Sequence, residues 1–191
     1  MNIRESGMPV QERWEAFFNP LTVLSELGID NNCRKIIDFG CGYGTFAIPA
    51  AQISHGIVYA IDIDDEFIAE CMRRVEENGL KTVKCIQRDF VLEGVGLPAN
   101  EADYAMLFNI LHAEDPIAIL KEAYRVLLPL GKVGIIHWNY DASTPRGPSM
   151  KIRPRPEQCQ EWIKLAGFNL IKPHINIPPY HYGIVGQKPQ N

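Results

Sequence analysis

A glycine-rich turn between two apolar segments contains the residues of this sequence that are best suited to ligand chemistry. The turn reads Asp38-Phe39-Gly40-Cys41-Gly42-Tyr43-Gly44, and a second apolar run, 57–61, ends on Asp62. Glycines at alternate positions let the backbone turn tightly and let a ligand approach without a Cβ in the way. An acid about 20 residues beyond such a turn is placed to accept hydrogen bonds from a ribose diol. We therefore expect a nucleoside-binding site.

Two common phosphate-binding patterns do not fit this turn. The dinucleotide fingerprint G-x-G-x-x-G needs its third glycine at position 45, where the chain has Thr45. No G-K-S or G-K-T follows the glycines, which excludes a P-loop. A nicotinamide-dependent oxidoreductase on a similar sheet stays as an alternative function, and the early third glycine argues against it.

The turn resembles the first motif of class I S-adenosylmethionine-dependent methyltransferases, an acid followed by x-G-x-G-x-G, and matches it at every fixed position. The resemblance covers about residues 30–191 and points to the small ubiquinone/menaquinone-biosynthesis-like group. It implies that S-adenosylmethionine is the cofactor and that its methyl group passes to a small-molecule acceptor. This cofactor has no phosphate but has an ammonium and a sulfonium, which suit an acid before the glycines. A non-catalytic protein that binds the same cofactor is a further alternative.

The resemblance also implies where the cofactor lies. Asp62 would hold the ribose hydroxyls, Asp89 would accept from the adenine amino group, and Asn109 would lie beneath the sulfonium. Asp89 has an alternative role as the cap of the following turn. Cys41 can be interpreted as a nucleophile, but a small residue beneath the ligand is the favoured interpretation. The expected cofactor-binding residues are Asp38, Gly40, Cys41, Gly42, Tyr43, Gly44, Asp62, Ile63, Asp89, Phe90 and Asn109.

Methyl transfer is an in-line displacement, so the protein must chiefly align the reacting atoms and exclude water. A general base is needed only if the acceptor arrives protonated, and His112 is the candidate for that role. A structural role or a substrate contact are its alternatives. His137 precedes Trp138 on its strand, so it should point the other way and pack. The candidate substrate-contacting residues are Trp14, Phe18, Trp138, Tyr140 and Arg146.

A loop at 139–156 is rich in basic residues and proline. It contains Arg146, Lys151, Arg153 and Arg155. Arginine binds carboxylates and phosphates in bidentate fashion, so this loop suits the substrate side of the domain and an anionic acceptor. A solvated basic loop is the alternative. An aromatic segment around Trp14 is interpreted as packing on the domain or covering a pocket.

Alternating apolar strands and amphipathic helices predict an α/β fold. Strands are expected at 36–39, 57–61, 82–87, 102–110, 132–138, 170–177 and 182–187, with the last two forming an edge hairpin around the prolines at 178–179. The resemblance implies a Rossmann-like, doubly wound, mostly parallel seven-stranded sheet with helices on both faces and an antiparallel C-terminal strand. Ligands bind at the carboxyl ends of such strands, where the residues named above gather.

Helical periodicity predicts which side chains face the core. Leu21, Leu24 and Leu27 should share one buried face of the first helix. In later helices the expected inward residues are Ile68, Met72 and Val75, and then Trp162 and Leu165. The helix that contains Tyr124 is expected to run through Leu127 and to end at Pro129 and Gly131.

Length and composition describe an ordinary globular chain. With 191 residues, we expect a single methyltransferase domain with an N-terminal helical cap at 1–30 and a cofactor-binding core at 31–191. A net charge of −4 argues against a nucleic-acid partner. No apolar run approaches the roughly 20 residues that span a membrane.

The cysteines bear on compartment and metal binding. The chain has 5 cysteines, an odd number, widely spaced and without a C-x-x-C pair. This pattern favours reduced thiols over a disulfide framework or a zinc site. We therefore expect a cytoplasmic enzyme without a bound metal.

Overall fold

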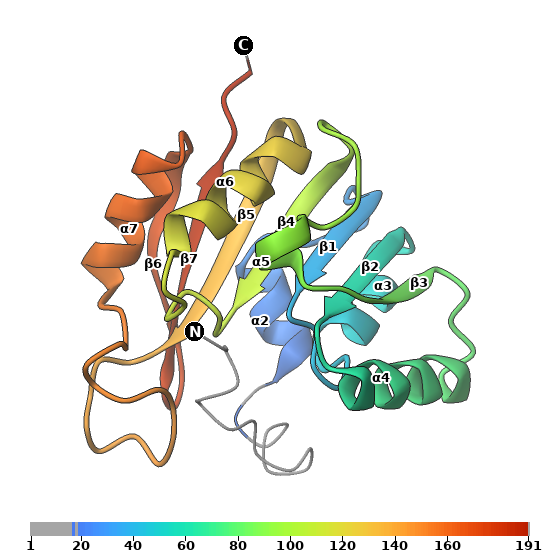
Figure 1. Cartoon of the computed structure of the whole chain (residues 1–191), viewed down its shortest axis with the longest axis horizontal. Coiled ribbons are helices and arrows are strands. Elements are labelled where there is room, and N and C mark those ends of the chain that lie inside the picture. The colour runs from blue at the N-terminus through green and yellow to red at the C-terminus, as the bar shows by residue number, and fades with distance from the viewer. Residues whose placement is uncertain (1–16, 18, 191) are drawn as a thin grey trace.

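A twisted seven-stranded sheet forms the centre of the computed structural model, which describes residues 17 and 19–190 (Figure 1). The strand order is β3-β2-β1-β4-β5-β7-β6. Neighbours from β3 to β5 pair in parallel, whereas β7 lies antiparallel between β5 and β6. The predicted mostly parallel sheet with an antiparallel C-terminal strand is confirmed. The strands are β1 (Lys35–Phe39), β2 (Ile57–Asp62), β3 (Val83–Gln87), β4 (Ala102–Phe108), β5 (Leu127–Trp138), β6 (Asn169–Ile177) and β7 (His181–Gln187).

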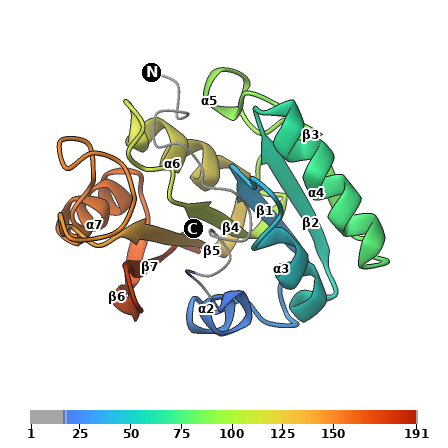
Figure 2. The same ribbon diagram turned by 90° about the horizontal axis from the view of Figure 1, so that it is seen from below.

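Helices cover both faces of this sheet (Figure 2). One apolar cluster joins one face to α2, α3 and α4, and a second joins the other face to α5, α6 and α7. None of the described helices is long and apolar enough to cross a membrane. The helices are α2 (Pro20–Glu26), α3 (Ala47–Ser54), α4 (Asp65–Glu77), α5 (Phe90–Glu93), α6 (Pro116–Val126) and α7 (Pro156–Leu165).

The ends of α4 follow local signals in the sequence. Asp64 caps its start, because the side-chain oxygen accepts the N–H of Glu66 at 3.0 Å. Gly79 ends it with a φ of 64°, a conformation that suits glycine. The N–H of Leu80 then donates to the carbonyl of Val75 at 3.1 Å. Such local bonds explain why this boundary is predictable from the sequence.

Three predicted inward side chains are instead exposed. Leu21, Met72 and Leu165 are 53%, 48% and 59% exposed, respectively. In α4 the fully buried Cys71, next to Met72, makes the core contact instead. In α7 the fully buried Ile163, two residues before Leu165, does so. Successive helix residues are about 100° apart. The docking of each helix on the sheet therefore decides which edge of its apolar stripe is buried.

The helix that contains Tyr124 ends earlier than predicted. α6 stops at Val126, and Leu127 already pairs with Ala102 of β4 as the start of β5. This strand continues through Pro129 and Gly131, the residues expected to follow the helix end. Pairing with a neighbouring strand is a tertiary interaction, so helical periodicity did not reveal it.

Close packing between β4 and β5 depends on one glycine. Tyr104 of β4 is fully buried, and its hydroxyl donates to the carbonyl of Leu27 at 2.9 Å. A Cβ at Gly134 of β5 would lie 2.2 Å from that hydroxyl oxygen. Only glycine at this position leaves room for the tyrosine.

We expect Gly134→Ala to lower the free energy of unfolding by about 1–3 kcal/mol, the usual cost of overpacking a tight core. Urea unfolding at equilibrium measures this difference. The same change in a Tyr104→Phe background should cost less, because the nearest clashing atom is gone. A single-variant loss below about 0.5 kcal/mol would contradict this account of the packing.

Candidate functional site

The glycine turn after β1 is fastened to the end of β2. The Asp62 carboxylate accepts the N–H of Gly42 at 2.9 Å through Oδ2 and the N–H of Asp64 at 3.1 Å through Oδ1. The N–H of Gly40 donates to the carbonyl of Ile61 at 2.8 Å. Sequence reasoning assigned Asp62 to a ribose but missed this role in holding the turn. Each carboxylate oxygen keeps a further lone pair for a ligand.

The three turn glycines all have positive φ. The angles are 75° at Gly40, 51° at Gly42 and 76° at Gly44. Residues with a side chain rarely adopt a positive φ, which agrees with the predicted need for glycine at these positions. At Gly44 a Cβ would also lie 2.7 Å from the sulfur of Cys71.

Asp38 lies buried at the end of β1. It is 3% exposed, and within the described residues its carboxyl forms no hydrogen bond or ion pair. Burial, with the nearby charge of Asp62, raises the pKa of Asp38 to about 8. Burial also raises the pKa of Asp62, against the lowering effect of the N–H groups of Asp64 and Gly42. Two buried acids in this arrangement favour a positively charged ligand group, since it would stabilise both as carboxylates.

Asn109 follows β4 in a left-handed conformation, with a φ of 58°. Its carboxamide nitrogen and oxygen are both buried, and neither has a hydrogen-bond partner in the described part of the chain. Buried amides in proteins are nearly always satisfied. This orphaned amide therefore points to a ligand that supplies both a donor and an acceptor, or to water.

Asp89, just after β3, caps the start of α5, which was its alternative role in the sequence analysis. Its Oδ1 accepts the N–H groups of Val91 and Leu92 at 3.0 and 3.1 Å, whereas no residue in the described chain donates to Oδ2. Phe90 is 6% exposed and packs edge to face on Phe39, with ring centroids 5.4 Å apart. One oxygen of Asp89 is therefore still available for a base.

The other predicted cofactor residues also lie around the turn. Tyr43 packs edge to face on Phe67, and Ile63 is 37% exposed just after β2. Cys41 is buried within the turn. A hydrogen bond with Cys71 lowers the pKa of Cys41, but burial and the nearby acids outweigh it and raise this pKa to about 11. The thiol stays protonated at neutral pH, so it does not suit nucleophilic chemistry.

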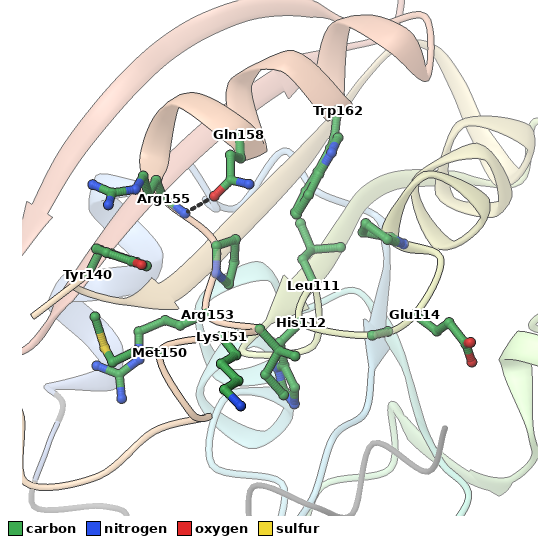
Figure 3. Close-up of a pocket in the computed structure, with 14 residues that line it drawn as sticks. Leu111, His112, Glu114, Tyr140, Met150, Lys151, Arg153, Arg155, Gln158 and Trp162 are labelled. Carbon is green, nitrogen blue, oxygen red and sulfur yellow. Dashed lines mark hydrogen bonds between the residues drawn. The ribbon is translucent and has the colours of Figure 1, made fainter. Parts of the chain in front are cut away.

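A cavity of about 550 Å³ opens beside the end of β4 (Figure 3). Two of the candidate catalytic and substrate-contacting residues line it, His112 and Tyr140. Three basic residues of the predicted substrate-side loop 139–156 also line it, namely Lys151, Arg153 and Arg155. Sequence reasoning did not assign Gln158 or Trp162 to a site, and no local signal indicates them, because only the docking of α7 brings them here. The lining residues are Leu111, His112, Ala113, Glu114, Pro116, Tyr140, Met150, Lys151, Ile152, Arg153, Pro154, Arg155, Gln158 and Trp162.

Trp138 and Arg146, two further candidate substrate residues, are not part of the described lining of this cavity. Trp138 is 3% exposed and packs against His181, with ring centroids 4.1 Å apart, and edge to face on Phe17. Arg146 is absent from the described lining of the cavity. Trp14 and Phe18 lie outside the described residues.

A buried imidazole packs against the candidate base. His137 is fully buried, its ring centroid is 5.6 Å from that of His112, and its Nδ1 accepts the N–H of Trp138 at 3.0 Å. Burial lowers the pKa of His137 well below 6.5 and lowers that of His181 to about 3. Both rings are therefore neutral at physiological pH, and His137 packs as predicted.

The strand order and the glycine turn with acids at the ends of β1, β2 and β3 define a class I methyltransferase fold. A family model described as a methyltransferase domain matches residues 36–131, half of the chain. The chain belongs to this family of S-adenosylmethionine-dependent methyltransferases.

Known proteins agree with this assignment. Aklanonic acid methyltransferase DauC from a Streptomyces species is 26% identical over 166 residues, which cover 80% of this chain and 74% of that protein. A demethylmenaquinone methyltransferase from a Geobacillus species is 31% identical over 103 residues, 52% of this chain and 43% of its own length. The chain thus spans less than half of the latter relative. The crystal structure of an S-adenosylmethionine-dependent methyltransferase from Aquifex aeolicus shares the fold, with a TM-score of 0.81 and 24% identity over 97% of this chain and 96% of that one.

The buried acid of β1 predicts an unusual pH dependence for the ligand-free protein. The pKa of Asp38 is about 8 in the folded state against 3.8 for the ordinary side chain. Its protonated form therefore contributes stability below about pH 4, and this contribution is lost as the pH rises towards about 8. Asp38→Asn, which mimics the protonated acid, should flatten the fall in the free energy of unfolding between about pH 5 and pH 8.

Urea unfolding across this pH range measures the effect. Asp65→Asn, a matched change at an exposed acid of α4, should keep the slope of the wild type. If the Asp38 variant had the same slope as well, the proposed burial effect would be wrong.

Proposed function

We propose that this methyltransferase acts on a small-molecule acceptor bound in the 550 Å³ cavity. The observation that supports this proposal is the position of the cavity. Leu111 and His112 line it, and they follow within three residues of Asn109, the expected neighbour of the reacting methyl group. The volume lies within the range of about 300–1,000 Å³ that is typical of small-molecule sites. The names of the two relatives, an aklanonic acid and a demethylmenaquinone methyltransferase, also favour a small acceptor.

The proposed cofactor site uses the chemistry of the strand ends. Asp62 accepts from the ribose hydroxyls, and Oδ2 of Asp89, the oxygen that takes no part in the helix cap, accepts from the adenine amino group. Asp38 favours the ammonium of the methionine portion, since a cation relieves the cost of its burial. The buried amide of Asn109 contacts the sulfonium end, and the turn 40–44 leaves room for close approach. When bound, S-adenosylmethionine supplies a methyl group made electrophilic by the adjacent sulfonium.

The remaining residues position the acceptor and exclude water. If the methyl acceptor arrives protonated, an imidazole nitrogen of His112 on the cavity side takes up its proton. The neutral ring of His137, which packs against His112, adds no charge beside this imidazole. Apolar cavity walls such as Leu111 and Trp162 exclude water from the reacting atoms. The nicotinamide alternative is not favoured, because buried acids occupy the turn where a pyrophosphate would bind.

Ligand-induced stabilisation tests the proposed cofactor site. S-adenosylhomocysteine should raise the melting temperature and NAD should not, because only a ligand of the folded state stabilises it. Asp62→Ala should weaken S-adenosylhomocysteine binding at least about tenfold, roughly 1.4 kcal/mol, by calorimetry. Asp65→Ala serves as the matched control and should bind normally. Equal binding by both variants would contradict the role proposed for Asp62.

The acceptor class requires an activity measurement. Transfer of a labelled methyl group from S-adenosylmethionine into pooled small metabolites should yield a methylated product. For an acceptor that must lose a proton, His112→Gln should lower kcat and change KM little. The substitution removes the base but keeps a neutral side chain that can form hydrogen bonds. Methylation of proteins in a cell extract, with no small-molecule product, would overturn the proposed acceptor class.

A further inference from the structure

One loop, at residues 139–156, supplies half of the described cavity lining, and two hydrogen bonds fix its ends. At its start, the N–H of Asn139 donates to the carbonyl of Tyr180 at 2.8 Å. Near its end, the hydroxyl of Tyr182 donates to the carbonyl of Pro154 at 3.0 Å. Neither bond involves the middle of the loop, so that part of the wall depends on other contacts.

The buried side chain of Arg153 holds the middle of the loop. It is 7% exposed, and in Figure 3 its guanidinium points away from His112 and Trp162. Because a guanidinium is planar and its N–H groups point in fixed directions, one side chain can set the relative positions of oxygens spread over residues 139–148. The five acceptors, at 2.6–3.1 Å, are the carbonyls of Asn139, Asp141, Arg146 and Pro148 and the hydroxyl of Thr144.

A glycine lets the loop backbone lie directly against this guanidinium. Gly147 has a φ of 114°, and a Cβ at this position would lie 2.7 Å from Nη2 of Arg153 and 2.8 Å from Cγ of Trp138. Trp138 is buried at the end of β5. The loop is therefore packed on Arg153 and on the sheet at the same point, and this close fit indicates one defined arrangement of the loop.

We propose that Arg153 is a positioning residue for methyl transfer, because it holds the loop 139–156 in the arrangement that lines the cavity before an acceptor binds. This inference rests on the proposed function, which places the acceptor in that cavity. When only a fraction of the molecules has the competent wall, the apparent affinity for an acceptor falls by that fraction. Arg153 therefore acts on acceptor affinity through the loop, and a bound acceptor still selects the assembled wall when Arg153 is replaced.

Amide hydrogen exchange tests whether Arg153 holds the loop. The N–H of Ile152 donates to the carbonyl of Ser149 at 3.0 Å within the loop, and the N–H of Gly42 donates to Asp62 at the glycine turn. In Arg153→Met the Ile152 amide should exchange about tenfold or more faster than in the wild type, because the loop opens more often. The Gly42 amide should exchange at the wild-type rate.

Steady-state kinetics separates positioning from a purely structural role. Transfer of a labelled methyl group from S-adenosylmethionine into the pooled metabolites is measured over serial dilutions of the pool. Arg153→Met should raise the apparent KM for the pool about tenfold and change kcat little, the opposite of the pattern expected for His112→Gln. Arg153→Lys keeps the charge but has fewer N–H donors and no planar fork, so its KM should be intermediate. Both variants should bind S-adenosylhomocysteine like the wild type.

A second variant and a matched control complete the test. Gly147→Ala should push the loop off the guanidinium and raise both the Ile152 exchange rate and the apparent KM, so it decides the matter where Arg153→Met does not fold. Arg125→Met is the control, because Arg125 also donates to a carbonyl, that of Leu97 at 2.9 Å, but is not part of the described lining. It should leave both quantities unchanged.

The outcomes separate this inference from the proposed function. If the wild type fails to bind S-adenosylhomocysteine or to methylate the pool, the proposed function is wrong and the inference falls with it. If the wild type is active, equal exchange of the Ile152 amide in the wild type and Arg153→Met overturns the inference and indicates a loop that orders only around an acceptor. A lower kcat at unchanged KM also overturns it, because that result indicates a loss of stability without positioning.

Discussion

The hydrogen bond from the N–H of Gly42 to the carboxylate of Asp62 is the interaction on which the site depends. It joins the glycine turn after β1 to the end of β2 and brings a second acid next to the buried Asp38. Neither acid has a cationic partner among the described residues. The electrostatic cost of this arrangement disappears when a cationic ligand binds. The geometry that holds the turn in place therefore also favours a positively charged cofactor.

The order of the strands places the cavity at the end of β4, the strand that neighbours β1. Because β4 pairs directly with β1, Asn109 and His112 follow a strand adjacent to the glycines. The next strand, β5, leads into the loop that Arg153 holds together. The hydroxyl of Tyr182, from the inserted β7, donates to the carbonyl of Pro154 at 3.0 Å and anchors the end of that loop. The antiparallel insertion thus contributes to the wall of the cavity as well as to the sheet.

Features governed by local chemistry were predictable from the sequence, whereas the packing of helices on the sheet and the pairing of strands were not. The positive φ angles of the turn glycines and the end of α4 at Gly79 follow from the backbone freedom of glycine. The exposure of Met72 and Leu165 and the early end of α6 depend on how each helix packs on the sheet and on strand pairing. Those contacts join residues far apart in the chain, so periodicity alone did not reveal them.

The same division applies to the candidate site. By itself, the sequence determined which acids lie at the ends of β1, β2 and β3 and that a glycine turn follows the first of them, because spacing and residue type are local properties. The tertiary structure decided that Asp89 caps a helix with one oxygen, that Trp138 is buried, and that Arg153 is committed to its loop. It also decided that Lys151 and Arg155 line a cavity. These outcomes depend on which carbonyls and rings the folded chain brings near each side chain, and no spacing in the sequence specifies them.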